Sequence, residues 1–147
     1  MKSLIIAFSL LLSVATTSSF ANETTVTPKV LKSFNSTFNN AKQVAWTVTE
    51  SFYKADFEMN GQYVTAFYLS DGTMAALTRN ITLAQLPVTL QADLKNNYDG
   101  YWVSDLFELT TENSTQYYIT VENGSEKVVL KSASNINWTS YKKDKKS

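Results

Sequence analysis

The side chains in this sequence whose spacing could support catalysis are the carboxylates of Asp56 and Glu58, which lie two positions apart in a stretch of alternating residues. Side chains two positions apart on a strand lie on one face, so these carboxylates could form the catalytic pair of a glycosidase. The same spacing is also found on any solvated strand. We favour this structural interpretation, predict no catalytic residues and expect that the protein is not an enzyme.

The sequence contains no histidine and no cysteine. Their absence removes the commonest general base, the thiol nucleophile and the usual zinc and copper ligands. The glycines stand singly, and there is no phosphate-binding loop, no calcium loop and no Gly-x-Ser-x-Gly motif. The sequence therefore predicts no metal site and no cofactor.

Aromatic side chains are the one class in surplus, with 8 Phe, 8 Tyr and 3 Trp. In the strand that we predict from Gln62 to Leu69, both faces carry aromatic rings, and the two predicted helices can cover only one face of a sheet. Exposed aromatic patches usually mark contact sites. The candidate partner-binding residues are Phe52, Tyr63, Phe67, Tyr118 and Tyr101. The alternative is that these rings form cross-strand pairs that stiffen the sheet.

A β-hairpin positions most of these candidates. From Tyr53 to Met59 every second residue is apolar, which is typical of a half-buried strand, and the partner strand runs from Gln62 to Leu69. Asn60-Gly61 lies between them, and this pair best tolerates the positive φ angles of a two-residue type I′ turn. The sequence therefore predicts a hairpin whose register is set locally.

Two amphipathic helices are predicted on either side of the strands. Thr27 and Pro28 form a helix start, followed by an apolar stripe at Val30, Phe34 and Phe38. Further strands are expected over 44–48 and 73–78. A second helix is expected from Pro87 to about Asn97, because the proline interrupts an earlier start signal at Thr82 and Gln85. Its stripe consists of Leu86, Leu90, Leu94 and Tyr98.

The two halves of the chain show an internal similarity. A shift of 56 positions places the first helical stripe on the second and Trp46 on Trp102. After the second tryptophan the halves fall out of step by several residues, and Asn60-Gly61 then corresponds to Asn123-Gly124. We expect both tryptophans in the core. The predicted fold is α+β, with two tandem helix-plus-antiparallel-sheet repeats (residues 28–80 and 82–135) and both helices on one face of a mainly antiparallel sheet. The alternative is two unrelated halves that share amphipathic helices.

The ends of the sequence indicate export. Residues 1–21 have the charge, apolar run and small-x-small site of a signal peptide, and no cysteine follows for lipid attachment. After a polar leader (22–27) we expect one domain over 28–141 and a basic, frayed tail over 142–147.

Without Lys2 the chain has 12 basic and 13 acidic residues, which argues against a nucleic-acid surface. We expect no membrane span, and a monomer or a weak dimer.

A series of packing and turn positions extends from about Thr27 to Ser134. It comprises Pro28-x-Val30, Phe34, Phe38, Ala41, Val44-x-Trp46, Tyr53-x-Ala55-x-Phe57, Gly61, Ala66-Phe67, Asp71, Leu86-Pro87, Leu94, Tyr98-x-Gly100 and Tyr117-Tyr118. In order and spacing this series resembles the PepSY-like, β-lactamase-inhibitor-like family of small exported proteins from Bacteroidetes-type bacteria. The resemblance implies two tandem helix-plus-sheet units, a periplasmic or outer-surface location and no established activity.

The related inhibitors clamp their target enzyme with the concave, aromatic-bearing face of the sheet, although this chain lacks their disulfides and an identifiable active-site-plugging loop. We therefore expect a non-enzymatic periplasmic binding protein that grips an unknown periplasmic or surface protein or peptide, in an inhibitor-like manner or otherwise, with the open sheet face. The alternative is a module that binds a small ligand or an envelope polysaccharide.

Overall fold

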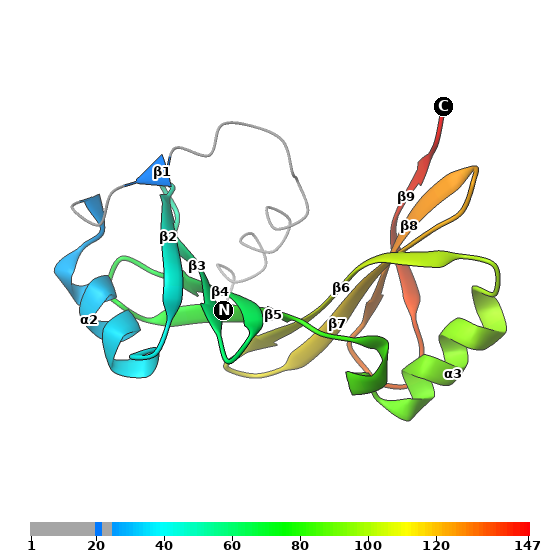
Figure 1. Cartoon of the computed structure of the whole chain (residues 1–147), viewed down its shortest axis with the longest axis horizontal. Coiled ribbons are helices and arrows are strands. Elements are labelled where there is room, and N and C mark those ends of the chain that lie inside the picture. The colour runs from blue at the N-terminus through cyan, green and yellow to red at the C-terminus, as the bar shows by residue number, and fades with distance from the viewer. Residues whose placement is uncertain (1–19, 22–24) are drawn as a thin grey trace. The chain divides into compact units, whose positions relative to one another are not determined.

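The computed structural model describes residues 20–21 and 25–147 (Figure 1). The predicted signal peptide lies outside the described residues, except for Phe20–Ala21. The elements, in chain order, are β1 (Phe20–Ala21), α2 (Pro28–Thr37), β2 (Lys42–Val48), β3 (Tyr53–Met59), β4 (Gln62–Tyr68), β5 (Met74–Asn80), the 3-10 helix η2 (Leu83–Gln85), α3 (Val88–Asn97), β6 (Trp102–Thr111), β7 (Thr115–Glu122), β8 (Glu126–Ser132) and β9 (Thr139–Lys145).

The fold is α+β, and its strands follow their sequence order, β1 to β9, in one sheet. Strand pairing is antiparallel from β1 to β4 and from β6 to β9. The chain divides into two compact units, Met1–Leu77 and Thr78–Ser147, each with one α-helix in its described part. No helix among the described residues has the length and apolar character needed to cross a membrane.

The predicted hairpin is confirmed. Strands β3 and β4 pair from Tyr53↔Tyr68 to Met59↔Gln62 without a register shift. Asn60 and Gly61 have φ angles of 53° and 75°, as a type I′ turn requires at both of its central positions. The turn sequence therefore sets the register, and the register decides which strand side chains face α2.

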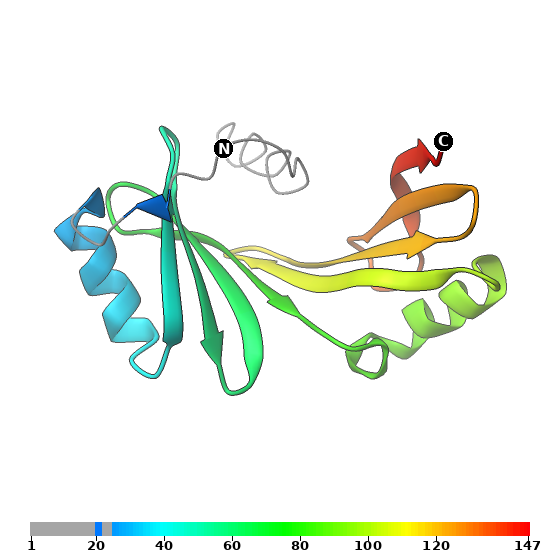
Figure 2. The same cartoon turned by 45° about the horizontal axis from the view of Figure 1, so that its top comes forward.

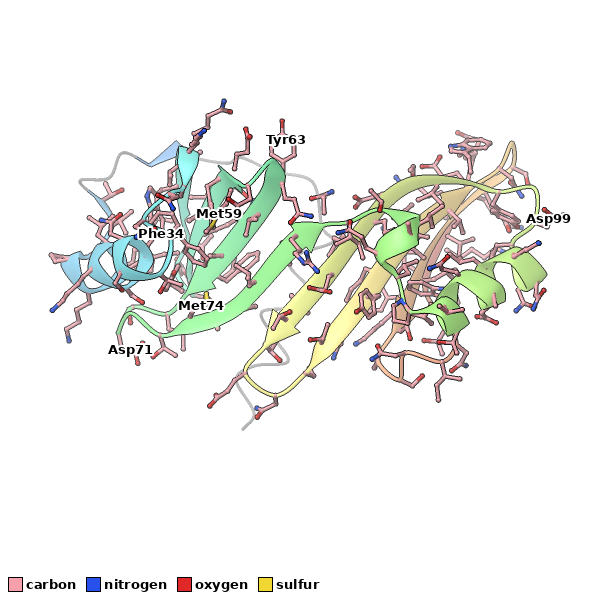
Figure 3. The ribbon with its side chains drawn as sticks, turned by 60° about the horizontal axis from the view of Figure 1, so that its bottom comes forward. Phe34, Met59, Tyr63, Asp71, Met74 and Asp99 are labelled. Carbon is pink, nitrogen blue, oxygen red and sulfur yellow. The ribbon has the colours of Figure 1, made fainter. Side chains whose placement is uncertain are left out.

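The core of the first unit lies between α2 and the strands (Figure 2). The side chain of Thr27 accepts a hydrogen bond from the backbone N–H of Val30, so the helix begins at the predicted cap. The Phe34 ring, labelled in Figure 3 between α2 and the sheet, lies 5.1 Å from the rings of both Trp46 and Phe57. Edge-to-face aromatic packing therefore joins the helix to two strands.

The core of the second unit is built on α3. Its predicted stripe is confirmed, with Leu86 and Leu90 buried and Leu94 and Tyr98 packed against the same cluster. The helix begins at Val88, one position after Pro87, and the earlier Thr82 signal caps the short helix η2. The indole N–H of Trp138 donates a 3.0 Å hydrogen bond to the Leu90 carbonyl, so the β8–β9 connection closes over α3.

Trp102 does not lie in the core, contrary to the sequence analysis. Trp46 is buried as predicted, but the Trp102 side chain is 52% exposed. The register of β6 against β7 shifts between Val103 and Asp105, so a bulge separates Trp102 from the buried Leu106. Residues four apart share a face of a regular strand, whereas the extra residue of a bulge turns them to opposite faces.

The ends of the two helices align at a different offset from the 56 positions used in the sequence. The C-caps, Phe38 and Tyr98, lie 60 positions apart, and each donates its backbone N–H at 2.8 Å to the carbonyl four residues earlier. The offset of 56 is one helical turn shorter. At an offset of 60 the counterpart of Trp46 is the buried Leu106, not Trp102.

The basic C-terminal residues are not frayed, which corrects a second expectation. Strand β9 pairs with β8, and Lys143 forms a 2.7 Å ion pair with Glu126. Lys146 pairs with Glu122 at 2.8 Å and donates a hydrogen bond of 2.9 Å to the Asn123 carbonyl. The acidic partners come from the β7–β8 hairpin, and therefore the lysine run could be recognised as a strand only in the folded chain.

Candidate binding surface

Each unit has a sheet face that points away from its helix, which we call the open face of that unit. In the first unit Ala55, Phe57, Ala66 and Tyr68 pack in the α2 cluster, so the residues that alternate with them occupy the open face. In the second unit Ile119 and Val121 pack in the α3 cluster in the same way. The predicted candidates can therefore be placed by strand alternation.

The open face of the first unit carries three of the five predicted residues. The Tyr63 side chain is 69% exposed, as expected, and Figure 3 shows it standing away from the ribbon at the start of β4. Phe67 is only 6% exposed, so the expectation of an exposed ring is wrong there. Phe52 is half-buried, with its ring 5.6 Å from that of Phe67. The contact with Phe52 therefore covers the Phe67 ring, which strand alternation alone would leave exposed on the open face.

The carboxylates singled out in the sequence also lie on this open face. Asp56 forms a 2.9 Å ion pair with Lys54 and accepts a 2.6 Å hydrogen bond from the Thr65 hydroxyl. Glu58 lies directly across from Tyr63 in the β3–β4 pairing. The two carboxylates thus have different neighbours, and Asp56 belongs to a surface network of charged and hydroxyl groups.

The open face of the second unit carries a row of three rings. Phe107 and Tyr118 stack in nearly parallel planes with centroids 5.2 Å apart, and Tyr141 meets Tyr118 edge-on at 5.7 Å. The Lys131 ammonium lies 5.6 Å from the centre of the Tyr118 ring. Tyr118 is fully buried, so the expectation of an exposed ring is wrong here too, and burial raises the pKa of its phenol.

Trp102 lies on the same open face, opposite Glu122 in the β6–β7 register. The Lys146 ammonium lies 4.5 Å from the centre of the indole ring, within the range of a cation–π contact. Hydrogen bonds from Lys146 and Ser104 to Glu122 lower the pKa of this carboxyl to about 2. The exposed indole is thus held beside a charged cluster.

Tyr101 lies apart from the other candidates, in the turn that follows α3. Its hydroxyl donates a hydrogen bond to Glu126, and its ring meets that of Tyr98 edge-on at 5.6 Å. Together with Leu83, Leu94 and Val103, these two rings line a groove of about 300 Å³ between α3 and the sheet of this unit. Tyr101 therefore belongs to the helix side of the second unit.

Two exposed aromatic residues on these faces, Trp102 and Tyr141, are not among the candidates predicted from the sequence. Within residues 25–147 the most exposed aromatic side chains are Tyr63, Trp102 and Tyr141, and all three lie on the open face of their unit. Both missed residues lie next to register shifts, in β6 and between β8 and β9. Regular alternation could not have assigned their face.

No protein-family model matches the chain. A search of curated proteins finds no match either.

Solved structures of bacterial proteins share the fold. A presumed periplasmic protein from Bacteroides eggerthii has a TM-score of 0.73 at 15% identity, over 82% of this chain and 88% of that one. A DUF2874 family protein from Bacteroides ovatus has a TM-score of 0.71 at 19% identity, with coverages of 82% and 88%. A BLIP-like protein from Bacteroides fragilis has a TM-score of 0.67 at 19% identity, with coverages of 85% and 92%. The chain therefore has the fold of these Bacteroides proteins.

Proposed function

We propose that this protein is a non-enzymatic periplasmic binding protein that grips a protein or peptide partner with the open faces of its sheet. The observation that supports the proposal is that the three most exposed aromatic side chains, Tyr63, Trp102 and Tyr141, all lie on these faces. Tyrosine and tryptophan dominate the energetics of protein interfaces because they bury a large area with few rotatable bonds.

The buried rings on the same faces support this role indirectly. Tyr118 is buried and contacts the exposed ring of Tyr141, so this ring packs on a side chain with little freedom. Phe67, which is also buried, contacts the half-buried ring of Phe52. A rigid aromatic surface loses less conformational entropy on binding than a mobile one. The charged groups near these rings, such as Lys54 and Asp56, would form a polar rim.

The two units would then present two related surfaces, and we propose that they are tandem copies of one helix-plus-sheet unit. The matching helix C-caps favour this idea, and so do the turns that follow them. Ala41 donates its backbone N–H to the Phe38 carbonyl at 3.1 Å, and Tyr101 donates to the Tyr98 carbonyl at 3.2 Å. Both contacts occur at the offset of 60.

The periplasmic location belongs to the proposal as well. It is supported by the signal-peptide pattern in residues 1–21 and by the fold shared with a presumed periplasmic Bacteroides protein. An enzyme bound in an inhibitor-like manner is one class of partner within this proposal, and the fold shared with a BLIP-like protein supports including it.

Site-specific photo-crosslinking in cells of the source bacterium tests the proposal. A photoreactive phenylalanine analogue replaces Tyr63, Trp102 or Tyr141 in turn, and Val88 serves as the control because it is 80% exposed but lies on α3. We expect the open-face positions to crosslink the same partner and Val88 not to do so. Crosslinking no stronger from the open-face positions than from Val88 would refute the proposal.

A further inference from the structure

A polar hollow lies in the first unit, at the turn end of the β3–β4 hairpin. It has a volume of about 410 Å³ and is lined by Asn40, Ala41, Lys42, Glu58, Asn60 and Gly61. These residues come from four parts of the chain: the α2–β2 connection, the first residue of β2, the end of β3 and the hairpin turn. The fold therefore brings together a set of polar side chains that are distant in sequence.

Four of these side chains are unused by the fold. Within the described part of the chain, the side chains of Asn40, Lys42, Glu58 and Asn60 take part in no hydrogen bond or ion pair. This holds even though Lys42 and Glu58 are direct partners in the β2–β3 register. One ammonium, one carboxylate and two amides are therefore available to a ligand, as donors and as acceptors.

An exposed aromatic ring stands beside the hollow. Glu58 pairs with Tyr63 in the antiparallel register, and directly opposed residues place their side chains next to each other on one face. Figure 3 shows Tyr63 projecting from the sheet at this end of the hairpin. The ring, 69% exposed, offers a flat apolar surface next to the Glu58 carboxylate.

The backbone around the hollow is held in place before any ligand arrives. The Asn60-Gly61 turn has both residues at positive φ, and a Cβ added at Gly61 would meet no atom within 4 Å, so the hollow is open on that side. On the other wall the N–H of Ala41 donates a 3.1 Å hydrogen bond to the Phe38 carbonyl at the end of α2. Preformed walls reduce the entropy lost on binding.

The chemistry of these groups selects the ligand. Lys42 and Glu58 carry opposite charges, so the side chains that line the hollow have no net charge and favour neither an anion nor a cation. Mixed donors and acceptors suit hydroxyl groups, which both donate and accept. A pyranose ring combines hydroxyls at its rim with an apolar C–H face that can pack on an aromatic ring. We propose that the hollow and Tyr63 form a binding site for a neutral saccharide.

An NMR titration of the whole protein tests this inference. The ¹⁵N-labelled protein is titrated separately with cellotetraose, xylotetraose, mannotetraose and chitotetraose, each to about 10 mM, the range of weak single-site affinities. We expect at least one of them to give saturable shifts of the Lys42, Glu58, Asn60 and Gly61 amides. No saturable shift with any of the four, or shifts confined to the groove beside Tyr98, would overturn the inference.

Matched variants identify the groups that bind. We expect Tyr63→Ala to weaken binding about three- to tenfold through loss of the aromatic contact. Glu58→Gln keeps the shape of the side chain but removes its charge, and Asn60→Gly removes an amide while preserving the turn. Both should weaken the same titration, whereas Tyr141→Ala should not. Undiminished binding by Tyr63→Ala together with Glu58→Gln would refute the site.

The saccharide site stands or falls separately from the proposed protein-binding function. Glu58→Gln and Asn60→Gly alter the hollow but leave Trp102 and Tyr141 untouched, so crosslinking from those two positions should persist in these variants. Saccharide binding that is lost while crosslinking is retained concerns the saccharide site alone. Crosslinking that is lost while saccharide binding is retained concerns the protein-binding function alone.

Discussion

Phe67 and Tyr63 provide a direct test of how the open face is divided between stability and binding. Both are aromatic, four residues apart on β4 and on the same face, yet Phe67 is 6% exposed and Tyr63 is 69% exposed. Truncating a buried phenylalanine to alanine costs about 3–5 kcal/mol, through lost transfer free energy and the cavity that remains. Truncating a largely exposed residue away from special features costs about 0.5 kcal/mol or less.

We therefore expect Phe67→Ala to lower the free energy of unfolding by about 3 kcal/mol, the lower end of that range, because its ring packs edge-on against a half-buried Phe52 rather than at the centre of a core. Tyr63→Ala should leave this free energy nearly unchanged. Phe67→Leu, which retains most of the apolar volume, should recover more than half of the loss.

The assay is urea denaturation followed by far-UV circular dichroism, combined with amide hydrogen exchange in β3 and β4. Exchange is needed because the chain has two compact units, which need not unfold together. Equal effects of Phe67→Ala and Tyr63→Ala on the free energy of unfolding and on exchange would show that our division of the open face is wrong.

Three further predictions concern single groups. Tyr68→Phe should raise the free energy of unfolding by about 1 kcal/mol, measured in urea, because the buried Tyr68 hydroxyl has no hydrogen-bond partner within the described residues. Burial also raises the pKa of the Tyr68 phenol to about 12. The stability that the neutral phenol contributes is therefore present below about pH 10 and is lost as the pH rises through 12. Lys146→Ala should raise the pKa of Glu122 from about 2 toward its ordinary value, measured by carboxyl NMR titration. Because the pKa of Glu122 is lowered in the folded protein, the associated stability is present above the unfolded pKa of 4.5 and is lost as the pH falls toward 2. A Glu122 pKa that the substitution leaves unchanged would contradict this pairing. Gly61→Ala should cost about 1 kcal/mol for its positive φ alone, and Gly72→Ala more, because its Cβ would also lie 3.0 Å from a backbone oxygen of α2; thermal unfolding that ranks the two in the opposite order would count against this reasoning.

The local elements could be predicted from the sequence because each depends on a few neighbouring residues. Thr27-Pro28 starts α2, Asn60-Gly61 sets the hairpin turn, and the stripes through Phe34 and Leu90 give the helices their buried faces. These features act over one or two turns of helix or strand. The candidate ring most exposed on the open face, Tyr63, follows from the same alternation.

Tertiary structure decided what lies next to what. The β6 bulge moved Trp102 out of the core, and acidic residues of the β7–β8 hairpin turned the lysine run into strand β9. The ring of Phe52 covers Phe67, and those of Phe107 and Tyr141 cover Tyr118. These covering rings lie far along the sequence or on other strands. Spacing along the chain determines the period of an element and hence its faces, whereas register shifts, cross-strand partners and the burial of a given ring depend on residues that only the folded chain brings into contact.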